Sequence, residues 1–537
     1  MLKRTGKLGE GAYGSVYKVD YNGKSFALKR NMVETDPSFI ITLRELDVMV
    51  WLGKHPNIIK LEMVTDGNPL RHGPMTPVRE RRRDDTLHFA LELGNITLHD
   101  LFYTEKGKDI TVDYIQFMAD ALIGLEYIHK KGFIHRDIKS CNLILCAMDE
   151  DLLNDLNDIK YSSKYIVKIC DFGMAKPFCN QDPQTPRLST PIYRSPELVV
   201  EHPKYNKSVD VWGVGCIFYE MAFRRSLIRC DIADNPDQIM NDLLVKICNK
   251  TDSKVYDKLI SEGGVKVNQS CNVMVKSFTD YFTKDTKEKF DKNIGKLDLF
   301  LDLLSKLLEF DSSKRLTAKE ALEHKFFDSH QSYINLIRSK YSGTIEPIIP
   351  ITIKNCIERR WVFENAFKIF RNRLAINWYS HRILFQAIDL FDRYLHVAYP
   401  KRVTMVETKH SGVLHSKHET EYRFFSCLYI SIKYFSSLYI PPSFNEFISS
   451  IYVNSGYSRE DYVRLTEVFE KQLVMKMLSY KVYRTTPYEI ADSHNITLDD
   501  RKVEILLNTY FQFSSHIPIT SNVIFDQFLK DIRNIII

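Results

Sequence analysis

A glycine-rich segment between two strand-like segments is the feature that most restricts how this chain can fold. The pattern G-x-G-x-x-G-x-V runs from Gly9 to Val16. Its glycines allow backbone N–H groups to approach a phosphate, because no Cβ stands in the way. In a dinucleotide-binding fold such glycines open a helix, whereas here residues 15–19 and 25–29 both read as strands. The sequence therefore predicts a phosphate-binding hairpin, followed by a strand that ends in Lys29.

Short motifs follow this hairpin in a fixed order. They are His-Arg-Asp at 135–137 with Asn142, Asp-Phe-Gly at 171–173, Ser-Pro-Glu at 195–197, Asp-Val-Trp-Gly at 210–213 and Lys-Arg-Leu at 314–316. The order is similar to that of the protein kinases. The resemblance covers residues 1–328 and implies a bilobal fold of the α+β class. The N-lobe would hold an antiparallel sheet and a helix, and the C-lobe would be helical.

The resemblance implies transfer of the γ-phosphate of ATP, with Mg²⁺, to a protein hydroxyl. This reaction depends on positioning and charge neutralisation more than on covalent catalysis. The implied catalytic residues are Lys29 on the α- and β-phosphates, Glu45 paired with Lys29, Asp137 as acceptor of the hydroxyl proton, and Lys139 near the γ-phosphate. The implied metal ligands are the hard oxygen atoms of Asn142 and Asp171. The implied ATP-binding residues are Leu8, Gly9, Gly11, Gly14, Val16, Ala27, Lys29, Glu92 and Ile144.

Residues 37–45 resemble the PSTAIRE helix of the cyclin-dependent kinases, with two extra residues and the final Arg44-Glu45 retained. Residues 55–61 continue the likeness. We therefore expect a serine/threonine kinase of the cyclin-dependent and MAP-kinase branch. An inactive pseudokinase is the alternative, but it would not need every catalytic residue type in place. Arg194 matches an arginine that supports proline after the target residue, so this preference is a hypothesis.

Two positions match regulatory sites of this branch. Tyr13 corresponds to an inhibitory tyrosine of the glycine loop, although it could serve only as an aromatic cap. Thr185 corresponds to the activating phosphothreonine, although Thr185 and the following proline could also form an unmodified turn. The resemblance implies that Arg44, Arg136 and Lys176 hold the phosphate, with lysine in place of the usual third arginine. Lysine lacks the planar, two-pronged contact of arginine, which predicts a weakened phosphate pocket.

The chain has 537 residues, which is more than one kinase domain occupies. Residues 329–356 contain glycine and prolines without a long periodic run, and they read as a linker. Residues 357–488 read as helices and resemble a cyclin box, with Asp-Arg-Tyr-Leu at 392–395 and Lys433 in signature positions. Glu446 matches the glutamate with which cyclins contact their kinase. Residues 489–537 are expected to form a helical extension or a partial second cyclin fold.

Together these likenesses predict a kinase that is activated in cis by its own cyclin box and acts on protein substrates. Two alternatives remain. The cyclin box could recruit a separate kinase or substrate, which would make the chain an adaptor, or it could be a substrate-binding bundle on a constitutively active MAP-like kinase. The fusion and the Ile-, Asn-, Lys- and Tyr-rich composition resemble proteins of giant DNA viruses.

Composition excludes several other classes. The formal net charge of +6 arises from 74 basic and 68 acidic residues, an excess too diluted to indicate nucleic-acid binding. No uninterrupted apolar stretch is long enough for a membrane span, and the start lacks the apolar core of a secretory signal. We therefore expect an intracellular protein of the cytoplasm or nucleus, without nucleic-acid or membrane partners.

Overall fold

The chain divides into two units in the computed structural model. The N-terminal unit comprises Met1–Phe178 and Gln184–Thr344, and the C-terminal unit comprises Cys179–Pro183 and Ile345–Ile537. The structure describes residues 3–11, 14–32, 36–66, 86–107, 110, 112–156, 163–179, 190–202, 204–228, 288, 290–341, 362, 381–398, 417–435, 488, 492 and 503.

The N-terminal unit begins with a five-stranded antiparallel sheet in the order β1-β2-β3-β5-β4. Its strands are β1 (Lys3–Gly11), β2 (Gly14–Tyr21), β3 (Lys24–Met32), β4 (Leu61–Asp66) and β5 (Thr86–Glu92). Gly11 pairs with Gly14, so the glycine-rich segment joins two strands, and the predicted hairpin is confirmed. A Cβ on Gly14 would lie 2.1 Å from the carbonyl oxygen of Arg30, so the close approach of β2 to β3 requires glycine.

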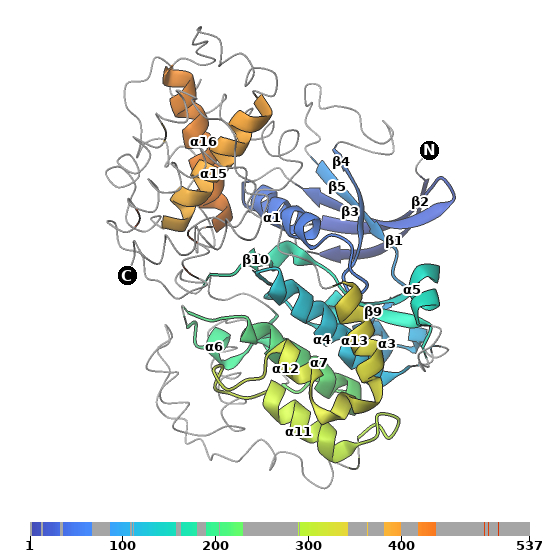
Figure 1. Cartoon of the computed structure of the whole chain (residues 1–537). Helices are drawn as coiled ribbons and strands as arrows, with labels where there is room; N and C mark the ends of the chain where they lie inside the picture. Colours follow the sequence, from blue (N-terminus) through green and yellow to red (C-terminus); the bar gives the residue numbers. More distant parts are fainter. Residues whose placement is uncertain are drawn as a thin grey trace, which may run out of the picture. The chain divides into compact units, whose positions relative to one another are not determined.

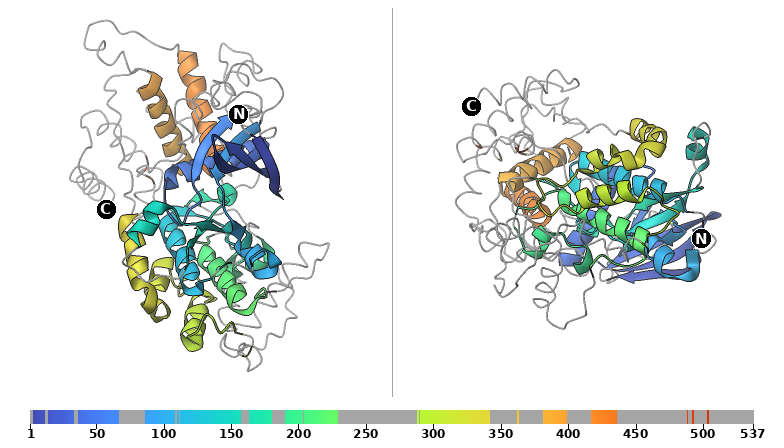
Figure 2. Two further views of the ribbon diagram at one scale, coloured as in Figure 1. Left: turned by 90° about the vertical axis from the view of Figure 1, so that its right-hand side faces the viewer. Right: turned by 90° about the horizontal axis from the view of Figure 1, so that it is seen from below.

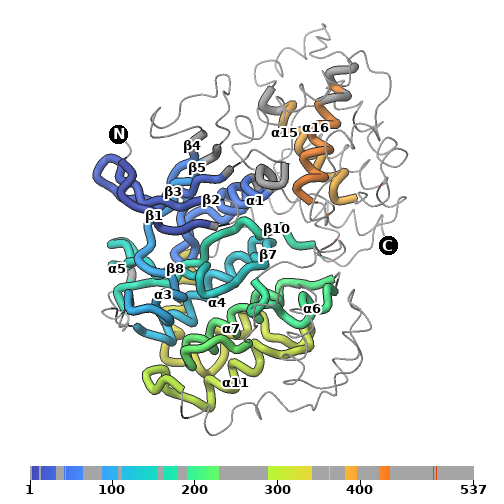
Figure 3. The backbone as a smooth tube through the Cα atoms, turned by 180° about the vertical axis from the view of Figure 1, so that it is seen from behind, coloured from blue at the N-terminus to red at the C-terminus, as the bar shows by residue number. Residues whose placement is uncertain are grey.

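Helix α1 (Asp36–Leu52) is the one helix among the described residues of the sheet-containing lobe, and it lies beside the sheet in Figure 3. Its apolar side chains Leu46, Val48 and Met49 are buried. The same helix contacts β3 and the short 3₁₀ turn η3 (Phe172–Met174). Helix α1 therefore carries Glu45 toward both Lys29 and the Asp-Phe-Gly segment.

The larger lobe is helical, and Figures 1 and 2 show its helices grouped below the sheet. Its helices are α3 (Leu98–Tyr103), α4 (Tyr114–Lys130), α5 (Glu150–Asp155), α6 (Pro196–Val199), α7 (Ser208–Phe223), α11 (Leu297–Leu307) and α12 (Ala318–Leu322). Its short strands are β6 (Ile96–Thr97), β7 (Phe133–Ile134), β8 (Leu143–Ala147), β9 (Tyr165–Ile169) and β10 (Lys176–Pro177). Together with the sheet-containing lobe, this arrangement confirms the predicted bilobal α+β fold for the N-terminal unit.

Helix α4 forms the centre of this lobe, because it contacts α7, α12, β9 and the helix α13 (Gln331–Lys340). It begins at Asp113, whose carboxylate caps the helix by accepting the backbone N–H of Gln116 at 3.0 Å. Both of its faces are largely apolar, and thirteen of its residues are buried. A helix that is apolar all round is stable only inside a core, which explains its central place.

Helix α13 (Gln331–Lys340) lies within residues 329–356, the stretch that the sequence analysis assigns to a linker. Its side chains Tyr333, Ile334 and Ile337 are buried in the N-terminal unit. With Leu336, the helix has four apolar residues among ten, and a helix this short is only marginally stable by itself, so tertiary packing stabilises it. The folded N-terminal unit therefore continues past residue 328.

In the C-terminal unit, the structure describes the helices α15 (His381–Ala398) and α16 (Lys417–Phe435) and a few single residues. The two helices lie side by side in Figures 1 and 3. Their contacts show an antiparallel pair, because Arg382 lies over the ring of Phe435 while Arg423 Nη1 donates to the hydroxyl of Tyr394 at 2.5 Å. Glu446 lies outside the described residues. Of the expected C-terminal extension, residues 489–537, the structure describes Asp492 and Val503. Among the described helices of both units, none is long and apolar enough to span a lipid bilayer.

Candidate active site

The loop between β7 and β8 is positioned by hydrogen bonds to a residue of α7, Asp210. The carboxylate of Asp210 accepts the backbone N–H of His135 at 2.8 Å and that of Arg136 at 2.7 Å. Burial opposes ionisation of Asp210, but hydrogen bonds with His129 and the backbone of His135 outweigh it and lower the pKa of Asp210. Arg136 has a φ of 67°, in the left-handed region, and such strain persists only where surrounding contacts enforce it.

Close packing also brings this loop onto α7. A Cβ on Gly213 would lie 2.9 Å from both Cβ and the carbonyl oxygen of Ile138. Glycine at this position of the Asp-Val-Trp-Gly motif is therefore required for the backbone of the loop to approach the helix. The motif thus combines a carboxylate that accepts the backbone N–H groups of the loop and a glycine that leaves room for it.

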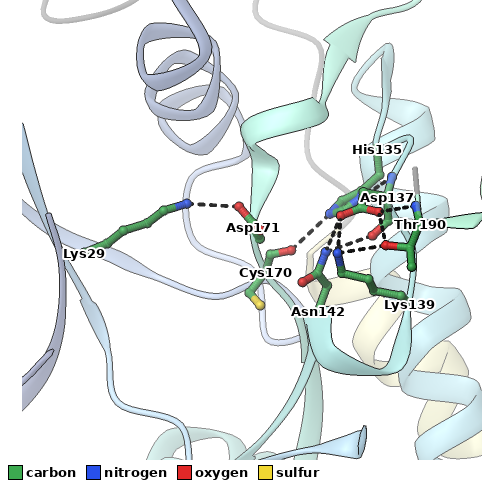
Figure 4. Close-up of polar contacts among 8 residues, drawn as sticks. All are labelled: Lys29, His135, Asp137, Lys139, Asn142, Cys170, Asp171 and Thr190. Atoms are coloured by element: carbon green, nitrogen blue, oxygen red, sulfur yellow. Dashed lines mark hydrogen bonds and ion pairs between the residues drawn. The ribbon is translucent and has the colours of Figure 1, made fainter. Parts of the chain in front are cut away.

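Asp137 is the centre of the polar network drawn in Figure 4. Its Oδ2 accepts Lys139 Nζ at 2.7 Å and Asn142 Nδ2 at 3.1 Å. Its Oδ1 accepts the backbone N–H of Thr190 at 3.2 Å and the Thr190 hydroxyl at 3.3 Å. Asp137 is nearly buried, at 8% exposure, so donors on both oxygens fix the direction of its carboxylate. The structure thus brings Asp137, Lys139 and Asn142 together, as the sequence predicts.

A second charged group joins α1, β3 and the segment after β9. Lys29 Nζ lies 2.6 Å from Glu45 Oε1 and 3.0 Å from Asp171 Oδ1. Burial alone would lower the pKa of Lys29, but the charges of Glu45 and Asp171 outweigh it, and the pKa of Lys29 is raised. The Lys29 ammonium in turn lowers the pKa of Asp171 against the effect of burial. Lys29 is therefore a permanent cation, and Asp171 is ionised at neutral pH.

The two predicted metal ligands have oxygen atoms available for a cation. The amide nitrogen of Asn142 is engaged with Asp137, while no described residue donates to its Oδ1. The Asp171 side chain is 46% exposed, and only its Oδ1 contacts Lys29. Asp171 also has a φ of 61°, in the left-handed region, so a strained backbone determines the position of its carboxylate. One ionised carboxylate and one amide oxygen fit the preference of Mg²⁺ for oxygen ligands.

The predicted ATP-binding residues fall on the strands of the two lobes. Leu8, Gly9 and Gly11 lie on β1, Gly14 and Val16 on β2, Ala27 and Lys29 on β3, Glu92 on β5, and Ile144 on β8. Val16 and Lys29 are direct partners in the β2–β3 ladder. The carboxylate of Glu92 is engaged with the backbone N–H of Lys60 at 2.6 Å and Lys168 Nζ at 2.8 Å. The carboxylate of Glu92 is therefore not left for a nucleotide, and its backbone N–H also donates, to the carbonyl oxygen of Lys60 at 3.0 Å.

A buried ion pair connects two other motifs. Arg315 donates to both carboxylate oxygens of Glu197, at 2.7 and 3.1 Å. The side chain of Arg315 is fully buried and that of Glu197 nearly so. The Ser-Pro-Glu motif and the Lys-Arg-Leu motif, which are more than 100 residues apart, therefore meet in one structural contact.

Three of the five predicted regulatory residues lie in the described part of the chain. Tyr13 and Thr185 lie outside the described residues. Arg136 donates through Nε to the carbonyl oxygen of Met174 at 2.7 Å and through Nη1 to the hydroxyl of Tyr205 at 3.3 Å. Lys176 is fully buried, and Arg44 is half-buried on α1.

Thr190 is a site residue that the sequence analysis did not assign. It lies after the segment that contains Thr185, five residues before Ser195, and it contacts both Asp137 and Lys139. Its fixed position before the Ser-Pro-Glu motif was the available signal. Spacing alone, however, gives no information about which side chain turns toward the carboxylate of Asp137.

Comparison with known proteins agrees with this geometry. The sequence model of the protein kinase domain matches residues 2–327. Mitogen-activated protein kinase 13 of Arabidopsis thaliana is 30% identical over 329 residues, which cover 60% of this chain and 78% of that protein. Mitogen-activated protein kinase HOG1 of Eremothecium gossypii is 33% identical, over 59% of this chain and 61% of that protein. Cyclin-dependent kinase C-2 of Oryza sativa subsp. japonica is 30% identical, over 60% of this chain and 58% of that protein.

A solved structure is also similar in part. The structure of the CAK complex of Chaetomium thermophilum bound to ATP-gamma-S contains a chain with a TM-score of 0.46 and 24% sequence identity. The match covers 61% of this chain and 90% of that chain.

Proposed function

The chain belongs to the protein kinase family, and we propose from this premise that it carries its own activator in residues 357–488. It is a serine/threonine protein kinase of the group that contains the mitogen-activated and cyclin-dependent kinases. The observation that carries the proposal is the 2.6 Å ion pair between Lys29 and Glu45, because it depends on the position of helix α1.

Each catalytic residue has a role that follows from its surroundings. Asp137 would accept the proton of the substrate hydroxyl, because its carboxylate is aimed by Lys139, Asn142 and Thr190. Lys139 would neutralise charge on the phosphoryl group, since its ammonium already lies beside Asp137. Lys29 would hold the phosphates of ATP, and Glu45 would keep Lys29 extended.

Mg²⁺ would be held by Asp171 and the Asn142 oxygen, where it supplies positive charge against the phosphates. Asp171 remains ionised beside Lys29, so it is ready to receive a cation at neutral pH. Asn142 keeps its oxygen available because its nitrogen donates to Asp137.

Activation in cis is supported by the resemblance of residues 37–45 to a cyclin-responsive helix and of residues 357–488 to a cyclin box. Arg393, which belongs to the Asp-Arg-Tyr-Leu stretch that resembles the cyclin signature, lies on α15 with its Nε 2.7 Å from Asp389 Oδ2. Binding of a cyclin box to α1 would favour the position in which Glu45 meets Lys29. Covalent linkage makes this encounter intramolecular, with an effective concentration of the order of millimolar for a short flexible tether.

The test compares the full chain with a chain that ends at residue 344, the limit of the N-terminal unit. We expect the shortened chain to phosphorylate a serine/threonine peptide at least about 100-fold more slowly, and residues 345–537 added in trans to restore part of the rate. Asp137→Asn in the full chain is the control for contaminating kinases. Equal rates of the full and shortened chains would reject activation in cis and favour an independent MAP-like kinase.

The adaptor alternative is distinguished by a second measurement. If the cyclin box recruits a separate kinase, material purified from a host cell would keep its phosphorylating activity after Asp171→Ala. If the chain is its own enzyme, that substitution removes the activity, because Asp171 is a metal ligand in the proposal and a partner of Lys29.

A further inference from the structure

A surface pocket of about 420 Å³ lies between α4 and α13, on a side of the N-terminal unit that the catalytic residues do not use. Figure 1 shows these two helices next to one another. The loop that follows α1 contributes His55 to the pocket lining. Its volume lies in the range of small-molecule sites, which is about 300–1,000 Å³.

Three aromatic rings, those of His55, Tyr127 and Tyr341, belong to the pocket lining. His55 stacks on Tyr127, with ring centroids 4.1 Å apart. Tyr341 presents its ring at a steep angle to His55, at 5.6 Å between centroids. The hydroxyl of Tyr127 donates to the carbonyl oxygen of Leu52 at 2.6 Å, which fixes that ring. A planar ligand would find preformed aromatic surfaces here.

His55 also offers a hydrogen-bond donor that lacks an acceptor. Its Nδ1 accepts the backbone N–H of Asn57 at 3.1 Å, and burial lowers the pKa of His55 to about 3. The neutral ring therefore carries its proton on Nε2. No acceptor for this N–H occurs among the described residues. His55 as a whole is buried, with 4% of its surface exposed. Since His55 lines the pocket, a ligand oxygen in the pocket could satisfy this donor.

Cationic groups surround the same space. Lys130 is exposed at the pocket, and its ammonium has no partner in the described part of the chain. Arg338 contacts Glu126 through Nη2 alone, at 2.8 Å. The other N–H groups of this guanidinium have no acceptor among the residues that the structure describes. Glu126 is the only acidic lining residue described, and it is already paired.

We propose that this pocket binds a small planar ligand that carries an anionic oxygen group. The rings of Tyr127 and Tyr341 would contact the plane of the ligand. The oxygen atoms of the ligand would accept hydrogen bonds from Lys130, Arg338 and the Nε2–H of His55. All three supply donors that have no acceptor among the described residues. Aromatic carboxylates and aryl phosphates share this chemistry.

The test uses ligand-observed ¹⁹F NMR on the full chain with 4-fluorobenzoate, 4-fluorophenyl phosphate and 4-fluorobenzamide. We expect at least one of the two anions to bind saturably and about tenfold more tightly than the uncharged benzamide, since bonds to charged groups carry the affinity. The stronger of the two anions identifies the ligand class. Excess AMP-PNP should not displace it, because the pocket shares no residue with the predicted ATP site.

Two substitutions locate the binding. Ser339→Trp fills the pocket and should abolish binding, whereas Ser332→Trp places the same side chain on an exposed position of α13 outside the pocket lining and should leave binding intact. Lys130→Gln should weaken anion binding about tenfold without changing the packing of α4. The proposal is overturned if neither anion binds, if benzamide binds equally well, if AMP-PNP competes, or if Ser339→Trp and Lys130→Gln both leave binding unchanged.

Discussion

Replacing Asp210 by asparagine tests how strongly α7 determines the geometry of the catalytic loop. The carboxylate accepts two backbone N–H groups, from His135 and Arg136, and lies 2.9 Å from His129 Nε2. Asparagine keeps the shape of the side chain but exchanges one acceptor oxygen for an NH₂ group. If the remaining oxygen accepts from Arg136, the NH₂ group faces the N–H of His135, and that buried donor is left without an acceptor.

The expected cost follows from these contacts. A buried donor without an acceptor costs about 1–3 kcal/mol, and the surviving bond weakens when the negative charge is lost, so the total should be about 2–4 kcal/mol. Contact with His129 can be kept in the variant. Burial lowers the pKa of His129, so its ring is neutral, and its Nε2 can accept a hydrogen bond from the new amide. The loop must then shift, and a displacement of about 1 Å in an active site can reduce kcat about 100-fold.

The assay combines urea unfolding with steady-state kinetics on the full chain. We expect Asp210→Asn to lower both the free energy of unfolding and kcat, while the KM for ATP changes little, because Lys29 and Glu45 stand on other elements. Asp298→Asn on the exposed face of α11 is the matched control. We compare kcat and the equilibrium constant for unfolding of Asp210→Asn with those of the control. If both stay within about threefold, the proposed role of Asp210 in positioning the catalytic loop is wrong.

Further substitutions test the other contacts. Lys29→Met should reduce kcat at least about 100-fold in a peptide assay with an unchanged circular dichroism spectrum, because a preorganised charge at the phosphates is lost. Arg315→Ala should lower the free energy of unfolding by about 3–5 kcal/mol in urea, because Glu197 is left charged and buried. Burial raises the pKa of Asp120 from 3.8 to about 7, so the folded state retains a proton that the unfolded chain has released. Stability should therefore fall as pH rises between these two values, and Asp120→Asn should remove that component in urea unfolding at several pH values.

Much of the active site could be predicted because its motifs are local. The spacing of His135, Asp137 and Asn142 already places three functional groups in one short loop. The hairpin at the glycine-rich segment could be predicted for the same reason, since strand alternation and glycine content are properties of neighbouring residues. Long-range partners are different. That Asp210 accepts the backbone of residues 135 and 136 depends on how α7 packs against the loop.

The weakest prediction concerns the end of the N-terminal unit. Helix α13 lies in a stretch that we expected to be a linker, because its local sequence is mainly polar and it has few apolar positions. Its stability comes from contacts such as the 2.5 Å hydrogen bond from Tyr333 to Asp120 on α4, which is 213 residues away along the chain. The pocket between α4 and α13 could not be predicted for the same reason.

By itself, the sequence determined the reaction class, the catalytic residue types and the antiparallel hairpin at the glycines, because each depends on short spacings along the chain. Only the tertiary structure decided which oxygen of Asp137 meets Thr190, which nitrogen of His55 accepts the backbone N–H of Asn57, and that α13 belongs to the folded unit. The physical reason is that hydrogen-bond direction and burial depend on contacts between residues that are distant in sequence. Residue identity limits these contacts but does not select among them.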